Sequence, residues 1–173
     1  MNTPKLREQG SLKTLRRALL AGLIAGTLDA LAAMIVYALI LGRTTPSHLW
    51  QGVASVCFGK DAFQGGPGMV AWGLFFHYWF ALCFALGYFI VYPYIRLLWA
   101  NKWLSALFYG AFAWCFMNLA VLPIFNGRVP HFRLVPVLRD MGILIVAIGI
   151  PIALIAAAWY RGGARLIPMD RGR

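Results

Sequence analysis

Asp29 is the residue in this sequence whose position is chemically most unusual, because it lies inside an apolar stretch that spans residues 18–41. A charged side chain at the centre of a membrane-spanning helix costs at least ~2.5 kcal/mol, so such residues face protein or water rather than lipid. Two interpretations follow. The carboxyl group either binds a proton or a cation, or it is a neutral acid that holds two helices together by a hydrogen bond.

His77 and Asn118 are polar side chains within two other long apolar stretches. An imidazole can relay protons or bind haem iron, but a haem with two histidine ligands needs a second embedded histidine. His48 and His131 lie between the apolar stretches, so haem is disfavoured. At a helical rise of ~1.5 Å per residue, Asp29, His77 and Asn118 fall in the middle-to-outer part of a bilayer. We treat them as one candidate polar site, while hydrogen bonding within the helix packing remains the alternative.

Lys60 and Asp61 precede a glycine-rich turn at residues 64–68. They are either a solvated surface pair, which contributes little stability, or the lining of an entrance to the polar site. The sequence contains no HExxH, GxSxG, Walker or dinucleotide-binding motif, and its cysteines lack metal-ligand spacing. We therefore predict no catalytic residue, no metal and no cofactor, and we do not expect an enzyme.

The elements that must position these residues are four long apolar segments. The chain has 173 residues, of which 61% are hydrophobic and 12% charged, whereas an ordinary soluble domain is ~25% charged. A membrane-spanning helix needs about 20 apolar residues. The segments that reach this length are 18–41, 69–92, 103–125 and 141–160.

These lengths predict an all-α integral membrane protein, built as an antiparallel bundle of four transmembrane helices. We expect a transmembrane domain at residues 18–160, with basic tails at 1–17 and 161–173. The two tails and the 96–102 loop hold about twice as many Lys and Arg residues as the other connections, which predicts that both termini are cytoplasmic.

The basic residues account for a net charge of +11. They flank the apolar segments instead of forming one patch with stacking aromatic residues. We therefore expect contacts with anionic lipid headgroups and no nucleic-acid partner.

Two connections lie on the predicted outer side. Thr45 and Pro46 are typical of an N-cap and a first helical residue, and apolar side chains recur at helical spacing up to Phe58. They predict an amphipathic outer-face helix that lies on the membrane surface or is partly re-entrant. The other connection, 126–140, contains Pro130 and Pro136, and we predict a coil there.

Small residues and one proline indicate how the helices pack. Gly22, Gly26 and Ala33 share a helical face with Asp29, so another helix can approach closely there, either within the chain or from a second copy. Pro151 removes one backbone hydrogen bond from the fourth segment, which predicts a bend.

Short elements of the chain resemble a family of small bacterial inner-membrane proteins that is similar in layout to the YagU-like proteins. The matching elements are Gly22-Leu23-Ile24-Ala25-Gly26, Phe58-Gly59, Ala62-Phe63, Gly65-Gly66, Phe76-His77-Tyr78, and Phe84 with Tyr88. The resemblance implies a location in the bacterial inner membrane and assigns no catalytic residue.

The function we expect is that of a small-solute or proton-coupled transport component, acting as a homo-oligomer or within a larger membrane complex. A structural or accessory subunit of a larger membrane complex is the first alternative. An intramembrane redox protein or enzyme is the second.

Overall fold

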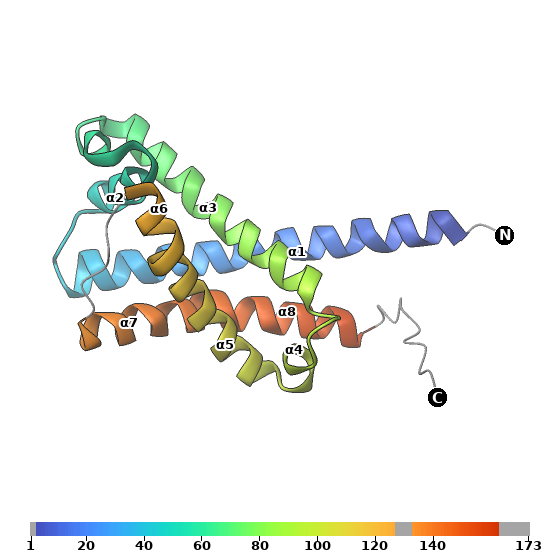
Figure 1. Ribbon diagram of the computed structural model, residues 1–173. Helices are drawn as coiled ribbons and strands as arrows, with labels where there is room; N and C mark the ends of the chain where they lie inside the picture. The colour runs from blue at the N-terminus through green and yellow to red at the C-terminus, as the bar shows by residue number, and fades with distance from the viewer. Residues whose placement is uncertain (1–2, 127–132, 163–173) are drawn as a thin grey trace.

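The computed structural model describes residues 3–126 and 133–162, and every element in these ranges is a helix. Successive long helices run in opposite directions, so α1 begins and α8 ends at the same end of the molecule (Figure 1). This end is named the terminal end, and the opposite end, which holds α2, the distal end. Four helical stretches are long and apolar enough to cross a membrane: Ser11–Ile40, Gly66–Val91, Lys102–Phe125 and Leu134–Arg161.

Three of these stretches contain a π-helical segment, which ends the first stretch and interrupts the third and the fourth. In chain order the elements are α1 (Thr3–Ala33), π-helix η1 (Met34–Ile40), α2 (Pro46–Phe58), 3-10 helix η2 (Gly59–Phe63), α3 (Gly66–Val91), α4 (Arg96–Ala100), α5 (Lys102–Cys115), π-helix η3 (Phe116–Val121), α6 (Leu122–Asn126), α7 (Leu134–Leu144), π-helix η4 (Ile145–Gly149) and α8 (Ile150–Arg161). Short π-helical turns often occur at functional sites, and η1 directly follows the turn that contains Asp29.

Two boundaries differ from the sequence-based expectation. α1 begins at Thr3, so the basic segment up to Arg17 is largely helical and continuous with the first apolar segment. The prediction of a coil is wrong for residues 134–140, because α7 begins at Leu134. Pro136 lies in the first turn of α7, where a backbone N–H has no partner within the helix and its loss costs little. Residues 127–132 of that connection, and the predicted C-terminal tail from residue 163, lie outside the described residues.

The core is built mainly from alanines, which allow the helices to approach closely. α1 packs against α3 and α8, and α5 packs against α8 and η4. Ala21, Ala25, Ala85 and Ala153 are fully buried at these interfaces. Such small-residue interfaces are typical of helices that associate through van der Waals contact rather than through large apolar side chains.

The helix predicted between the first two spans is present as α2. The Thr45 side chain accepts a hydrogen bond from the backbone N–H of His48 at 3.2 Å, and Pro46 is the first helical residue, which confirms the predicted start. α2 packs against α3, and its residues Trp50 and Gln51 are buried. The helix is therefore part of the helix packing and is not confined to the surface.

Candidate functional site

Asp29 and His77 lie opposite each other in the interface between α1 and α3. The Nδ1 atom of His77 is 4.0 Å from Oδ2 of Asp29, and the two side chains are 13% and 17% exposed, respectively. The Nε2 atom of His77 is 2.8 Å from the carbonyl oxygen of Gly26. Because a carbonyl oxygen only accepts hydrogen bonds, Nε2 carries a proton. Nδ1 is then the ring atom that faces Asp29 and can gain or lose a proton.

Two charge states fit this geometry. An imidazolium can lie beside a carboxylate, or a neutral imidazole can lie beside a carboxylic acid. Both states contain the same number of protons and differ only in the group that holds the shared one. The separation is about 1 Å longer than an N–O hydrogen bond, so the two groups are neighbours without being hydrogen-bonded. A proton exchanged within this pair would pass between α1 and α3.

Trp50 of α2 covers the imidazole of His77. The two rings meet edge to face, with their centroids 5.3 Å apart, and Trp50 is 6% exposed. α2 comes this close because Gly73 of α3 has no side chain. A Cβ atom at that position would lie 1.9 Å from the carbonyl oxygen of Trp50. The backbone contact at Gly73 thus positions the Trp50 ring over the His77 imidazole.

Gly22 and Gly26 bring α1 against α3 at the same interface. A Cβ atom on Gly22 would lie 3.0 Å from Cα of Leu82, and one on Gly26 would lie 2.9 Å from Cβ of Ala81. These two glycines therefore contact α3 of the same chain and are not available to a second copy. Ala33, one turn beyond Asp29, is half-buried and ends α1.

Thr27 and Tyr78 add a polar contact beside the Asp29–His77 pair. The hydroxyl group of Thr27 donates to the carbonyl of Leu23 at 2.8 Å, so its oxygen accepts from the hydroxyl group of Tyr78 at 3.1 Å. Tyr78 follows His77 directly on α3. This hydrogen bond therefore helps to hold His77 against α1.

The remaining predicted site residues are not joined to this pair by the contacts of the described residues. The side-chain amide of Asn118 donates to the carbonyl of Trp114 in its own helical stretch at 2.9 Å. Lys60 and Asp61 lie in η2 at the distal end, are exposed, and form no ion pair in the described part of the chain. Pro151 is the second residue of α8, one residue after the π-helical segment η4 ends at Gly149.

A second polar cluster, which the sequence analysis did not identify, joins η1 to α7. The hydroxyl group of Tyr37 donates to Asp140 Oδ1 at 2.5 Å, and Nε of Arg139 donates to the same oxygen at 2.7 Å. Arg139 Nη2 also donates to the Tyr37 hydroxyl oxygen at 3.1 Å. The guanidinium carbon lies 4.8 Å from the centre of the Tyr37 ring, in a cation–π geometry.

This cluster gives a first prediction about stability. We expect Tyr37→Phe and Asp140→Asn each to lower the free energy of unfolding by about 1–2 kcal/mol, because each removes a partner from a shared hydrogen-bond network. In a double-mutant cycle, measured by denaturant unfolding in detergent, the two effects should fall short of additivity by about 1 kcal/mol. Tyr94→Phe is the matched control, since Tyr94 is 78% exposed. Strictly additive effects would show that the two side chains do not interact.

The described residues contain no group of three or more His, Cys, Asp or Glu side chains placed to hold a metal ion. The chain matches no protein-family model, no curated protein sequence and no solved structure.

Proposed function

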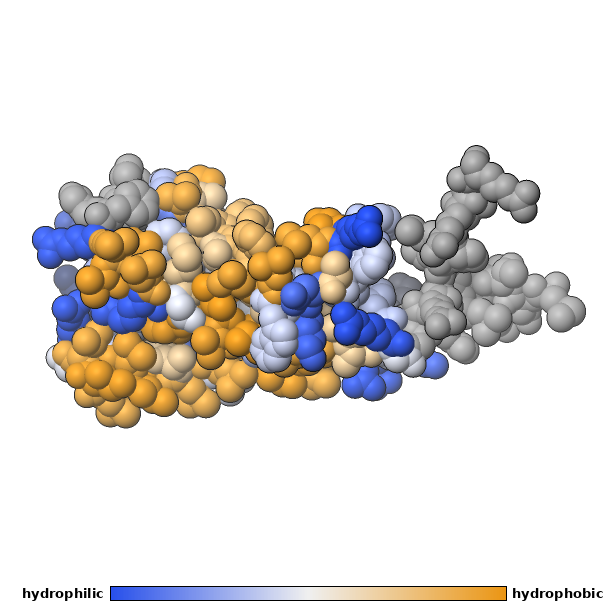
Figure 2. Space-filling model, turned by 90° about the horizontal axis from the view of Figure 1, so that it is seen from below, coloured by the Kyte–Doolittle hydropathy of each residue, from blue (hydrophilic) through white to orange (hydrophobic). Residues whose placement is uncertain are grey.

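We propose that this chain is a multi-pass protein of the bacterial inner membrane, folded as an antiparallel bundle of four transmembrane helices. The apolar surface supports this proposal. Leu39, Ile124 and Val135 are more than three-quarters exposed, at 77%, 76% and 76%. Figure 2 shows a largely hydrophobic face between hydrophilic patches towards the two ends. Water disfavours such a continuous apolar surface, whereas lipid chains accommodate it.

We place both termini in the cytoplasm. The positive-inside rule compares Lys and Arg residues close to the membrane ends of the helices. The described ones at the distal end are Arg43, Lys60, Arg133 and Arg139, and those at the terminal end are Lys5, Arg7, Lys13, Arg16, Arg17, Arg96, Lys102 and Arg161. The larger basic group supports a cytoplasmic location of the terminal end. This orientation also brings the larger basic group next to the anionic headgroups of the inner leaflet.

The activity that we propose is that of a proton-coupled transport component for a small solute, not of an enzyme. The observation behind it is the 4.0 Å approach of Asp29 and His77 on neighbouring helices. Ionisable groups inside membrane proteins commonly form proton pathways. In this chain Asp29 and His77 Nδ1 bind and release the coupling proton, while Trp50 shields the imidazole. The protein acts as a homo-oligomer or within a larger membrane complex.

The test uses purified protein in liposomes with an imposed pH gradient and a pH-sensitive dye inside. We expect wild-type protein to dissipate the gradient when one member of a panel of small solutes is added. Asp29→Asn should slow this flux at least tenfold, because the amide cannot exchange a proton but nearly keeps the side-chain shape. Asp61→Asn is the matched control: the Asp61 carboxylate, a candidate entrance residue in the sequence, is exposed in η2 and is not joined to Asp29 or His77 by the contacts of the described residues.

The opposite result is equally informative. If wild-type and Asp29→Asn liposomes both behave like empty liposomes, while the variant unfolds at a lower temperature, Asp29 is a packing residue. The proposal then fails, and a role as an accessory subunit of a larger membrane complex takes its place.

A further inference from the structure

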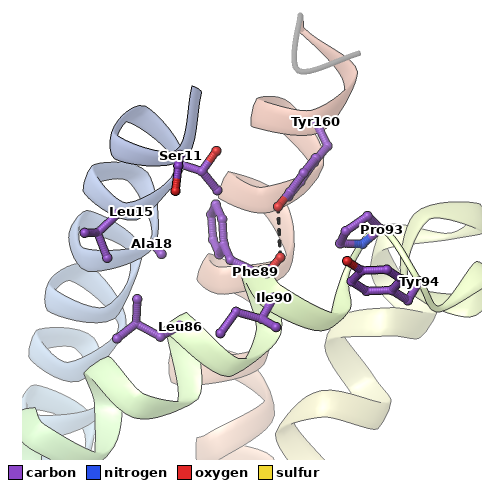
Figure 3. Close-up of a pocket in the computed structure, with 10 residues that line it drawn as sticks. Ser11, Leu15, Ala18, Leu86, Phe89, Ile90, Pro93, Tyr94 and Tyr160 are labelled. Carbon is purple, nitrogen blue, oxygen red and sulfur yellow. Dashed lines mark hydrogen bonds between the residues drawn. The ribbon is translucent and has the colours of Figure 1, made fainter. Parts of the chain in front are cut away.

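Two adjoining cavities lie at the terminal end, away from the Asp29–His77 pair. The first is a groove of about 440 Å³ between α1, α3 and α8 (Figure 3). The second has a volume of about 270 Å³ and is lined by Tyr92, Pro93, Trp99, Tyr160 and Arg161. Pro93 and Tyr160 line both cavities, so the two spaces meet at these residues.

The groove has apolar walls along most of its length. Leu15 and Ala18 of α1 line it together with Leu86, Phe89 and Ile90 of α3 (Figure 3). The Tyr160 hydroxyl group donates to the carbonyl of Phe89 at 2.8 Å, which ties α8 to α3 at this point. The groove is therefore a built feature of the helix packing, of a shape and polarity that suit a hydrocarbon chain.

The second cavity contains polar groups that retain unused hydrogen-bonding capacity within the described residues. Arg161 Nη2 donates to the carbonyl of Trp99 at 3.1 Å, and an arginine has further N–H donors. The Tyr92 hydroxyl group is buried and makes no hydrogen bond of good geometry within the described residues. Burial raises the pKa of Tyr92, while the nearby Arg161 guanidinium opposes this shift. A neutral hydroxyl donor and a guanidinium thus line the same small space.

The surroundings place this space at the level of lipid headgroups. Tyr94 and Trp99 are exposed beside the two cavities, and aromatic side chains of this kind collect at membrane interfaces. Arginine is well suited to phosphate, because its planar N–H groups can donate two parallel hydrogen bonds. An apolar groove that opens onto an arginine at headgroup depth fits a molecule with a hydrocarbon chain and a phosphate.

We propose that these two cavities bind one anionic glycerophospholipid of the cytoplasmic leaflet, with an acyl chain in the groove and the phosphate at Arg161. The inference rests on the proposed membrane topology but not on the proposed transport activity. Lipid binding and proton flux are measured separately, so the failure of one is distinguishable from the failure of the other.

The test follows binding by native mass spectrometry of the purified protein in detergent. The probes are phosphatidylglycerol, phosphatidylcholine with the same acyl chains, and inorganic phosphate. We expect phosphatidylglycerol to bind wild-type protein at least tenfold more tightly than phosphatidylcholine, and Arg161→Gln to abolish this preference. Arg96→Gln is the charge control, because Arg96 is exposed at the same end and does not line either cavity.

A second pair of variants tests the groove independently of Arg161. Ser11→Trp places a large ring at the edge of the groove and should weaken the binding of both lipids at least tenfold. Leu12→Trp places the same ring on the exposed face and should leave the binding of both lipids unchanged. Equal binding of the two lipids, unchanged by Arg161→Gln, would overturn the proposal. So would inorganic phosphate that binds as tightly as phosphatidylglycerol does, with Ser11→Trp having no effect on the binding of either lipid. If Arg161→Gln does not fold, the Ser11→Trp comparison decides.

Discussion

Gly73→Ala is expected to lower the free energy of unfolding by about 3 kcal/mol, a large effect for the addition of one methyl group. The added Cβ atom would lie 1.9 Å from the carbonyl oxygen of Trp50. Both atoms belong to or adjoin backbone in packed helices, so a rotamer change cannot relieve the clash. α2 must move away from α3. Denaturant unfolding in detergent measures the effect on stability.

Displacement of α2 should also uncover His77, because Trp50 is the ring that covers it. We expect His77 in Gly73→Ala to be acylated severalfold faster by diethyl pyrocarbonate than in the wild type, as read by mass spectrometry of peptides. His48 is exposed and serves as an internal reference for reagent activity.

Gly68→Ala is the matched control on the same helix. A Cβ atom at Gly68 would have no neighbour within 4 Å, so alanine should leave stability unchanged or raise it by up to ~1 kcal/mol. If Gly73→Ala is as stable as Gly68→Ala and leaves His77 protected, α2 does not pack on α3 in the way described.

The sequence predicts the existence of α2 but not its docking, and the reason is physical. Thr45, Pro46 and the apolar spacing are local features, and they define a helix wherever it lies. The docking depends on the missing side chain of Gly73, which stands in a different helix. No periodicity distinguishes a glycine that meets a backbone carbonyl, such as Gly73, from one that faces open space, such as Gly68.

The four apolar segments were predictable for the same reason, because length and hydropathy are properties of the segment alone. The residue at which the fourth helical stretch starts was not predictable in this way. Pro136 suggested a coil, although a proline is tolerated in a first helical turn. Leu134 begins α7 two residues earlier, so the proline lies in that turn.

The candidate site was partly predictable. An ionisable residue in an apolar segment is conspicuous wherever it lies, so Asp29 and His77 stood out, and the row of Gly22 and Gly26 indicated a face of close packing. Their separation of 4.0 Å is a property of the interface between two helices and not of either sequence pattern. The contact of Tyr37 with Asp140 joins residues 103 positions apart and had no local signature.

The contact between α5 and η4 leads to the other large expected effect. Gly149→Ala should lower the free energy of unfolding by about 3 kcal/mol, because its Cβ atom would lie 2.3 Å from the carbonyl oxygen of Ala106. The two backbones also meet at Gly110, where a Cβ atom would lie 2.4 Å from Cα of Ile145. Each helix thus places a glycine against the backbone of the other. A Cβ atom added to either glycine would meet backbone, and a side-chain rotation could not relieve the clash.

Gly142→Ala separates this clash from the general effect of replacing a helical glycine. Gly142 lies in α7 and would place its Cβ atom in open space, so alanine should raise stability by up to ~1 kcal/mol. The two positions lie about two helical turns apart, and both variants replace a glycine by alanine. Only the backbone contact at Gly149 distinguishes them. Equal unfolding free energies for Gly149→Ala and Gly142→Ala would mean that α5 and η4 are not in contact at this position. The packing of the fourth stretch would then have to be assigned anew.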